Sequence, residues 1–206
     1  MTKVFFDVAM SLDGYIAGPN RGPKNPLGDG GIDMHTWMFN TATFREMLHL
    51  GEGGGTGGDD DLVKRVFARA GAHVMGRHMF EEGEVSWPED APFHSPVFVL
   101  THDKRAPWER KGGTTFYFVT DGIESALEQA KAAAKGRDVR ISGGAYTIKE
   151  YIQAGLIDEF TLHIAPMLLG EGVRLLDRFS RDKLKIEQIE ATGSELVTHI
   201  SYRVVR

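Results

Sequence analysis

The sequence predicts a three-layer α/β fold, in which helices cover both faces of a mainly parallel sheet that ends in an antiparallel hairpin. Along most of the chain, short apolar runs alternate with longer segments whose apolar side chains recur at helical spacing. Strands that are separated by helices pair in parallel, so this alternation indicates a parallel sheet between helical layers. The last two strands, 185–191 and 196–205, are joined only by the short turn 192–195, which predicts a hairpin.

Composition and charge narrow the possible functions. The chain has 206 residues, and we expect a single cytoplasmic domain over 1–206. The absence of cysteine excludes disulfides, thiolate metal sites and a cysteine nucleophile. A net charge of -5 gives no sign of the concentrated basic face that nucleic acids and membranes attract, so we expect neither as a partner. The eight histidines lack metal-ligand spacing, and no apolar window is long enough to cross a membrane, so no metal and no membrane span are expected.

The predicted strands are short apolar runs. Residues 3–10 form a nearly continuous run rich in Val and Phe, which is typical of a strand buried on both faces. In residues 157–165 apolar and polar side chains alternate, which predicts that one face meets solvent or a partner chain. His73 and His163 lie within strands, and we interpret both as structural. The strands are, in chain order, residues 3–10, 72–76, 97–101, 114–120, 138–142, 157–165, 185–191 and 196–205.

The predicted helices are marked by helical spacing and by capping residues. Segment 34–50 fits one helix or two short ones, with Thr41 or Thr43 as a cap between them. Asp121 with Glu124 three residues later has the spacing of a capping box. The predicted helices are residues 34–50, 62–70, 121–135 and 145–154, and a further helix starts after Gly76.

A glycine-rich segment, 51–58, contains a formal G-x-G-x-x-G match at Gly53, Gly55 and Gly58. A dinucleotide-binding turn must follow a strand, whereas this one follows a helix and opens onto the acidic run 59–61, which would repel a pyrophosphate. We therefore interpret the segment as a connector. The acidic run is interpreted as the N-cap and favourable first-turn charge of the next helix.

Three strands end in a glycine or a hydroxyl side chain beside a helix start or basic residues. These ends are Gly76-Arg77, Thr101-His102 and Gly143-Gly144. Taken alone, Gly143-Gly144 fits either a tight turn or a phosphate seat, because bare backbone and the N–H groups of a helix start bind anions. Three such ends at one edge of a parallel sheet indicate a nucleotide cleft. The loop 11–20 after the first strand is either a lid over this cleft or a plain surface connection.

Several of these motifs together resemble a known superfamily. They are SLDGYIAG within residues 4–18, the run 74–77 followed by Phe80-Glu81, the strand 97–101, and the long motif ISGGAYTIKEYIQAGLIDEFTLHIAPMLLGEGVRLLD. The chain resembles the dihydrofolate reductase-like superfamily over nearly its whole length. It is most similar to the C-terminal reductase domain of the bifunctional riboflavin-biosynthesis deaminase–reductase and its stand-alone relatives.

The resemblance implies a dihydrofolate reductase-like fold and an NADPH-dependent reductase of a pterin-like or pyrimidine-like substrate. It also implies a homodimer, with strands 157–165 and 196–205 pairing or packing across a two-fold axis. By the same resemblance, a cis peptide joins Gly143 to Gly144. The residues that the resemblance assigns to the cofactor are Val8 and Ala9 at the nicotinamide, Ile16 and Gly18 on the closing loop, Gly76, Arg77 and Met79 at the phosphates, Leu100, Thr101 and His102 at the adenosine, and Gly143, Gly144, Ala145, Tyr146 and Thr147 at the pyrophosphate.

The catalytic acid is less well defined. Dihydrofolate reductases keep an acidic residue near the first helix, and Asp33 with His35 and Trp37 beside it lies near that place; Asp13 is a second candidate. Either aspartate also fits a turn or N-cap. The chain departs from the riboflavin-pathway pattern in lacking the deaminase half and in having Tyr15 where a lysine is usual. These departures leave open a second hypothesis, a nucleotide-binding protein of the same fold without turnover.

Overall fold

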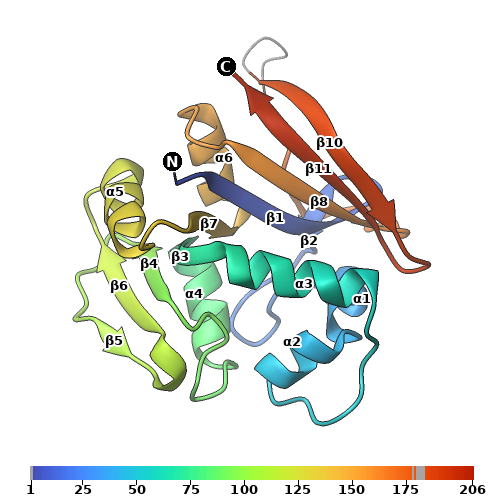
Figure 1. The fold of residues 1–206 in the computed structure, drawn as a ribbon, viewed down its shortest axis with the longest axis horizontal. Helices are drawn as coiled ribbons and strands as arrows, with labels where there is room; N and C mark the ends of the chain where they lie inside the picture. Colours follow the sequence, from blue (N-terminus) through green and yellow to red (C-terminus); the bar gives the residue numbers. More distant parts are fainter. Residues whose placement is uncertain (1, 178, 180–183) are drawn as a thin grey trace.

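The computed structural model describes residues 2–177, 179 and 184–206 and contains one nine-stranded sheet (Figure 1). The strands of this sheet are β1 (Val4–Ser11), β3 (Ala70–Gly76), β4 (Pro96–Leu100), β5 (Trp108–Glu109), β6 (Thr115–Val119), β7 (Asp138–Gly143), β8 (Glu159–Ala165), β10 (Lys185–Gly193) and β11 (Thr198–Val205). Their order is β10-β11-β8-β1-β7-β3-β4-β6-β5. The pairs from β8 to β6 are parallel, whereas β10–β11, β11–β8 and β5–β6 are antiparallel, which confirms the predicted mixed sheet.

A second sheet of two strands links the loops that follow β1 and β8. It pairs β2 (Tyr15–Ala17) with β9 (Val173–Arg174) in antiparallel fashion. The sequence did not predict these strands or β5, because segments of two or three residues are too short to show a periodicity. The candidate lid 11–20 is therefore anchored at its centre to a distant part of the chain.

The helices form the outer layers. They are α1 (Thr36–Phe39), α2 (Ala42–Met47), α3 (Gly58–Arg69), α4 (Arg77–Glu84), α5 (Ile123–Ala133) and α6 (Ala145–Gln153), with 3₁₀ turns η1 (Asp33–His35) and η2 (Lys111–Gly113). Thr41 divides α1 from α2 as predicted, since its side chain accepts a hydrogen bond from the Phe44 N–H. No helix in the described ranges is long and apolar enough to cross a membrane.

Two predicted caps are wrong. The N-cap of α3 is Gly57 and that of α5 is Gly122, rather than an aspartate in either case. Both glycines have positive φ angles, 136° and 99°, a region that only glycine enters without steric cost, and this sets where each helix begins. The acidic run 59–61 still lies in the first turn of α3, where its charge favours the helix.

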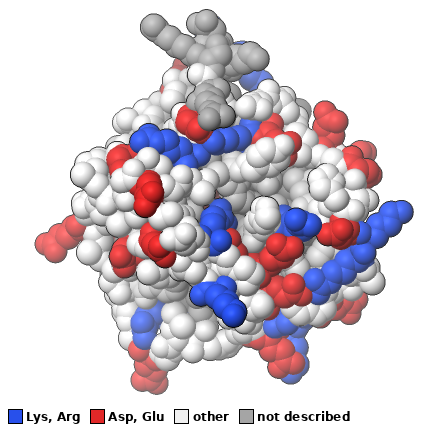
Figure 2. Space-filling view, turned by 180° about the vertical axis from the view of Figure 1, so that it is seen from behind, with Lys and Arg blue, Asp and Glu red and all other residues white. Residues whose placement is uncertain are grey.

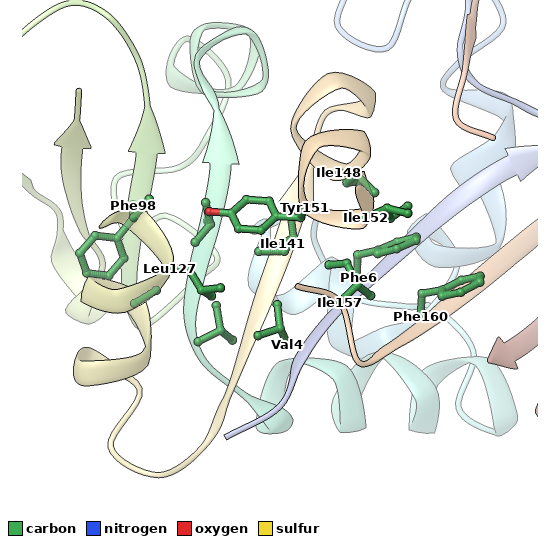
Figure 3. Packing of buried hydrophobic residues seen from close by; sticks show 14 of the residues in the cluster. Val4, Phe6, Phe98, Leu127, Ile141, Ile148, Tyr151, Ile152, Ile157 and Phe160 are labelled. Carbon is green, nitrogen blue, oxygen red and sulfur yellow. The ribbon is translucent and has the colours of Figure 1, made fainter. Parts of the chain in front are cut away.

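One face of the sheet is packed against α5 and α6 by apolar side chains (Figure 3). Phe6 of β1 stacks on Phe160 of β8, with ring centroids 5.0 Å apart. Tyr151 of α6 is buried beside Ile141, and its hydroxyl donates to the Ile123 carbonyl at 2.7 Å. Each such side chain contributes about 1.5–3 kcal/mol by burial, so this layer carries much of the stability.

The opposite face is covered by α1, α2 and α3 at one end and by α4 at the other. The first group forms an apolar cluster around Trp37 and Phe44, and the second a cluster around Phe80 and Phe116. Helices on both sides of the sheet confirm the predicted three layers. The expectation that one face of strand 157–165 meets solvent or a partner holds only in part: Glu159 and Thr161 on that face are partly exposed, whereas His163 is 2% exposed and packs against Trp37.

The strands expected to pair across a two-fold axis are internal. The segment 157–165 corresponds to β8, which lies between β1 and β11, and 196–205 corresponds to β11, which lies between β8 and β10. Neither has a free edge, so these strands cannot pair with a second copy, whereas packing of their faces across a two-fold axis stays a prediction. β10 forms the outer edge at this end of the sheet (Figure 1), and all nine of its residues are exposed.

Candidate active site

A cavity of about 470 Å³ lies near the carboxyl ends of β1 and β7, between the α1–α3 cluster and α4. Aromatic side chains form much of its wall, among them Trp37, Phe39, Phe67 and Trp87. Its polar lining consists of Asp7, Arg21, His35, Glu82, Ser86, Arg140, Ser142 and His163. A concave, largely apolar site with a few placed polar groups suits a small planar molecule.

The cavity contains a buried ion pair. Arg140 of β7 donates from Nε and Nη2 to the two carboxylate oxygens of Asp7 in β1, at 2.6 and 2.9 Å. Burial alone raises the pKa of Asp7, but the Arg140 guanidinium and His163 outweigh it and hold that pKa well below its usual range. Asp7 is therefore ionised and cannot itself donate a proton at neutral pH.

A histidine pair extends from this carboxylate toward the surface. His163 Nε2 lies 3.4 Å from Asp7 Oδ2, and His163 Nδ1 lies 2.8 Å from Nδ1 of His199 on the next strand. His199 Nε2 in turn lies 3.1 Å from Asp59 Oδ1 at the start of α3. The Trp37 ring contacts both imidazoles, with centroids 4.8 Å from each. His163 thus lines the cavity instead of serving only as the structural residue that its strand position predicted.

His73 fits the structural interpretation better. It is fully buried on β3, and its Nδ1 lies 2.9 Å from Ser142 Oγ. Burial lowers the pKa of His73 to about 3, so the ring is neutral at physiological pH. Ser142, its partner, lines the cavity beside the glycine turn.

The peptide between Gly143 and Gly144 is cis, as the family resemblance implied. Both glycines line the cavity at its rim, where α6 begins without a side-chain cap. A Cβ on Gly143 would lie 3.1 Å from Met79 Sδ, and one on Gly144 would lie 3.6 Å from Arg21 Nη1. Glycine at position 143 therefore leaves room for Met79 and permits a φ of 132°, and the start of α6 has no side-chain cap on its first N–H groups.

Arg21 is a residue that the sequence did not single out. It donates from Nε and Nη2 to both oxygens of Glu82 on α4, at 2.9 Å each, and so ties the loop after β2 to the wall of the cavity. The loop that carries Arg21 contains no recognisable motif, so its ion pair with Glu82 could not be predicted. The place of Arg21 beside Gly144 becomes visible only in the structure. Asp7 could have been predicted as a functional residue, because a charged side chain within a buried apolar strand requires a partner.

The remaining predicted cofactor residues lie beside the cavity or farther along the same sheet edge. Val8, Ala9, Ile16 and Met79 line the cavity. Arg77 is half-exposed at the start of α4 and donates to Asp103 at 3.0 Å. Those that do not line the cavity are Gly18, Gly76, Arg77, Leu100, Thr101, His102, Ala145, Tyr146 and Thr147. Because β7, β3 and β4 are neighbours, the three glycine or hydroxyl strand ends do lie in a row.

Two of the three predicted catalytic residues are not in the cavity. Asp13 accepts hydrogen bonds from Ser11 Oγ and from the Leu169 and Gly170 N–H groups, and the Ser11 bond is the main cause that lowers its pKa to about 2. It fastens the turn after β1 to the loop after β8. Asp33 is exposed on η1, where the turn directs Met34 inward instead. Of the three, only Trp37 lines the cavity, so these positions do not support either aspartate as a proton donor.

One face of the molecule carries charges of both signs. On the face drawn in Figure 2, Lys and Arg side chains are interspersed with Asp and Glu. Within the described residues, no group of three or more His, Asp and Glu side chains could hold a metal ion.

Comparison with known proteins agrees with this geometry. The model of the RibD C-terminal domain family matches residues 2–198. The Bacillus subtilis protein YyaP is 25% identical over 95% of this chain and 92% of its own length. A protein from Shewanella sp. PV-4 named for riboflavin biosynthesis superposes with a TM-score of 0.66 at 24% identity, with both chains fully covered.

Two further structures share the fold at lower identity. Dihydrofolate reductase from Enterococcus faecalis, solved with NADP(H), has a TM-score of 0.56 at 15% identity over 98% of this chain and 96% of that chain. Acinetobacter baumannii RibD has a TM-score of 0.64 at 16% identity. The match covers all of this chain and 59% of the RibD chain. With the family model matching almost the entire chain, the protein belongs to the RibD C-terminal domain family.

Proposed function

We propose that this protein is an NADPH-dependent oxidoreductase that transfers a hydride to a small planar heterocycle of the pterin or pyrimidine kind. The observation that carries the proposal is the cavity itself, with an open cis Gly143-Gly144 turn at its rim and the Asp7–Arg140 pair inside it. Membership of the RibD C-terminal domain family and the likeness to a dihydrofolate reductase structure solved with NADP(H) support a reductase and a nicotinamide cofactor.

The residues present fit such a cofactor. The uncapped start of α6, with no Cβ at Gly143 or Gly144, would hold the pyrophosphate through backbone N–H groups. Arg77, at the start of α4 and beside the end of β4, would pair with a 2′-phosphate. Val8 and Ala9 line the cavity from the central strand and would meet the nicotinamide. When bound, the cofactor supplies the hydride.

The chain's own residues would bind and orient the substrate. The aromatic wall excludes water and stacks on a flat ring, and the Nε1–H of Trp37, which has no partner among the described residues, would be satisfied by an acceptor on it. Asp7 and Arg140 line the cavity, and the carboxylate lone pairs and guanidinium N–H groups that their mutual pairing leaves unused would bind the N–C–N edge of an aminopyrimidine.

Titration with NADPH, followed by nicotinamide fluorescence, tests the cofactor assignment. Saturable binding below millimolar concentration is expected, and NADH should bind more weakly. Arg77→Ala should reduce the preference for NADPH over NADH about tenfold, because a charge-assisted hydrogen bond to the 2′-phosphate is lost. Lys131→Ala, on the exposed side of α5, is the matched control. Absence of binding at millimolar NADPH would contradict the proposal.

A second candidate is a nucleotide-binding protein of the same fold without turnover. It is favoured by one observation: Asp13 and Asp33 lie outside the cavity, Asp7 is ionised, and Glu82 is paired with Arg21. A panel of pteridines and aminopyrimidines, assayed for NADPH oxidation, separates the two. Binding of cofactor with no oxidation across the panel supports the second candidate, and any substrate-dependent oxidation removes it.

We also propose that the protein is a homodimer. The exposed edge strand β10, with Ile186 and Ile189 45% and 47% exposed, is a surface that a second copy would cover. Light scattering at working concentration tests this, and a clean monomer would contradict it.

A further inference from the structure

We infer that the buried His163–His199 pair holds one excess proton, carried by His163, and that His163 Nε2–H donates it to the substrate in the cavity, with His199 and Asp59 as positioning residues. The inference rests on the proposed reductase function for its last step only. The first part, the excess proton, is a property of the protein alone.

A count of protons in the chain of contacts leads to the excess proton. Three contacts join Asp7 to His163, His163 to His199, and His199 to Asp59. Each contact needs one proton, and ionised carboxylates supply none, so all three must sit on the four ring nitrogens. Two neutral imidazoles carry only one proton each. The geometry is therefore satisfied only when one of the two rings is an imidazolium.

The surroundings place that charge on His163. Asp59 accepts from His199 Nε2, which fixes the other nitrogen of His199, Nδ1, as an acceptor toward His163. Burial and the neighbouring His163 lower the pKa of His199, which also favours the neutral form of that ring. His163 then carries protons on both nitrogens, with Nε2–H directed toward the Asp7 carboxylate, and Trp37 covers the ring pair.

The distances around Asp7 show that His163 Nε2 is held more loosely than Arg140, as expected for a proton donor. Asp7 already has short bonds to Arg140 at 2.6 and 2.9 Å, whereas its distance to His163 Nε2 is 3.4 Å. The loosely held Nε2–H belongs to a residue that lines the cavity. The charged and titratable groups that face the pair are Asp7 of β1, Arg140 of β7, His35 of η1, and Asp59 and Arg65 of α3.

The chemical step balances with NADPH as the reductant. A hydride, released as a C–H bond of the nicotinamide breaks, would form a new C–H bond at the carbon of a substrate C=N group, and the electron pair of the C=N π bond would move to nitrogen. The Nε2–H bond of His163 breaks, and its proton joins the nitrogen. His163 is left neutral with Nδ1–H still donating to His199. Water that enters the open cavity after product release returns the proton to Nε2.

Nuclear magnetic resonance of protein labelled with ¹⁵N-histidine tests the excess proton without cofactor or substrate. At neutral pH, both nitrogens of His163 should be protonated, and His199 should be protonated at Nε2 only. In His199→Gln, His163 should show one N–H instead of two. Finding both rings neutral in the unaltered protein would overturn the inference and leave the reductase proposal untouched.

Kinetics test the donation. His163→Gln should keep NADPH binding and lower kcat by about 100-fold or more, the usual contribution of a general acid. His199→Gln should lower kcat with KM unchanged. His49→Gln, an exposed histidine outside the cavity lining, is the control and should behave as the parent protein. Loss of NADPH binding in the parent protein would count against the proposed function, whereas an unchanged kcat in His163→Gln would count against the donor alone. Should His163→Gln fail to fold, Asp59→Asn gives the same test through the His199 tautomer.

Discussion

The two faces of the sheet are built from the same strands but differ in the chemistry of their side chains. The face under α5 and α6 is filled by an apolar cluster that includes Phe6 and Ile141, with aromatic stacking of Phe6 on Phe160. The face under α1–α3 carries Asp7, Arg140 and His163, from the same three central strands. Successive residues of a strand point to opposite faces of the sheet. Neighbouring residues such as Phe6 and Asp7 therefore belong to the apolar layer and to the candidate site, respectively. A change on the apolar face can therefore lower stability without altering the site, whereas a change to the buried charges should affect both.

The largest effect is expected from breaking the buried ion pair. Arg140→Met leaves the Asp7 carboxylate buried without its partner, which should lower the free energy of unfolding by about 3–5 kcal/mol. The double variant Asp7→Leu/Arg140→Met removes both charges and should recover most of that loss while remaining inactive. Urea unfolding of the parent, single and double variants measures both. A double variant as unstable as the single one would show that packing, not the unpaired charge, is responsible.

A truncation on the apolar face should affect stability alone. Ile148→Ala empties a fully buried site on α6 and should cost on the order of 3 kcal/mol. Because Ile148 lies on the other side of the sheet from the cavity, the affinity for NADPH should stay within about twofold, or roughly 0.4 kcal/mol. Thermal unfolding and cofactor titration of the same sample check this. A large fall in affinity would mean that the two faces are coupled.

A buried histidine on the polar face should make stability depend on pH in the mildly acidic range. His73 is neutral when folded, because burial lowers its pKa to about 3, whereas in the unfolded chain it takes up a proton near the ordinary histidine pKa of about 6.5. The unfolded state therefore binds more protons below that value, and stability should fall as the pH drops from about 6 toward 4, at up to about 1.4 kcal/mol per pH unit. His73→Leu should flatten this slope in urea unfolding, and the exposed His49→Leu should not. An equal slope in His73→Leu would refute the assignment.

The smallest effect is expected at the edge of the polar layer. Thr41→Ala removes the side-chain cap of α2 and should destabilise the protein by about 1 kcal/mol. Thr120→Ala, at an exposed position after β6, is the control. Thermal unfolding checks both variants. Since α2 contributes Phe44 to the cavity wall, a slight loss of substrate affinity in Thr41→Ala would sharpen the link between this layer and the site.

Local chemistry let the sequence predict much of the fold. The apolar run that became β1, the Thr41 cap and the C-terminal hairpin each depend on residues within a few positions of one another. The turn at Gly143-Gly144 could be predicted for the same reason, and the family resemblance implied its cis peptide. The helix starts at Gly57 and Gly122 were missed, because nearby aspartates offered an equally good local signal and only the backbone angles decide between them.

The site itself was decided by tertiary structure. Asp7 and Arg140 are 133 residues apart and meet because β1 and β7 are neighbours in register, and His163 faces His199 only because β8 and β11 pair at that position. A sequence shows which side chains a strand places on one face, but not which strand lies beside it or which helix covers it. The cleft edge could therefore be predicted from strand ends and glycines, whereas the paired charges and the histidine pair arise from contacts between strands distant in the chain.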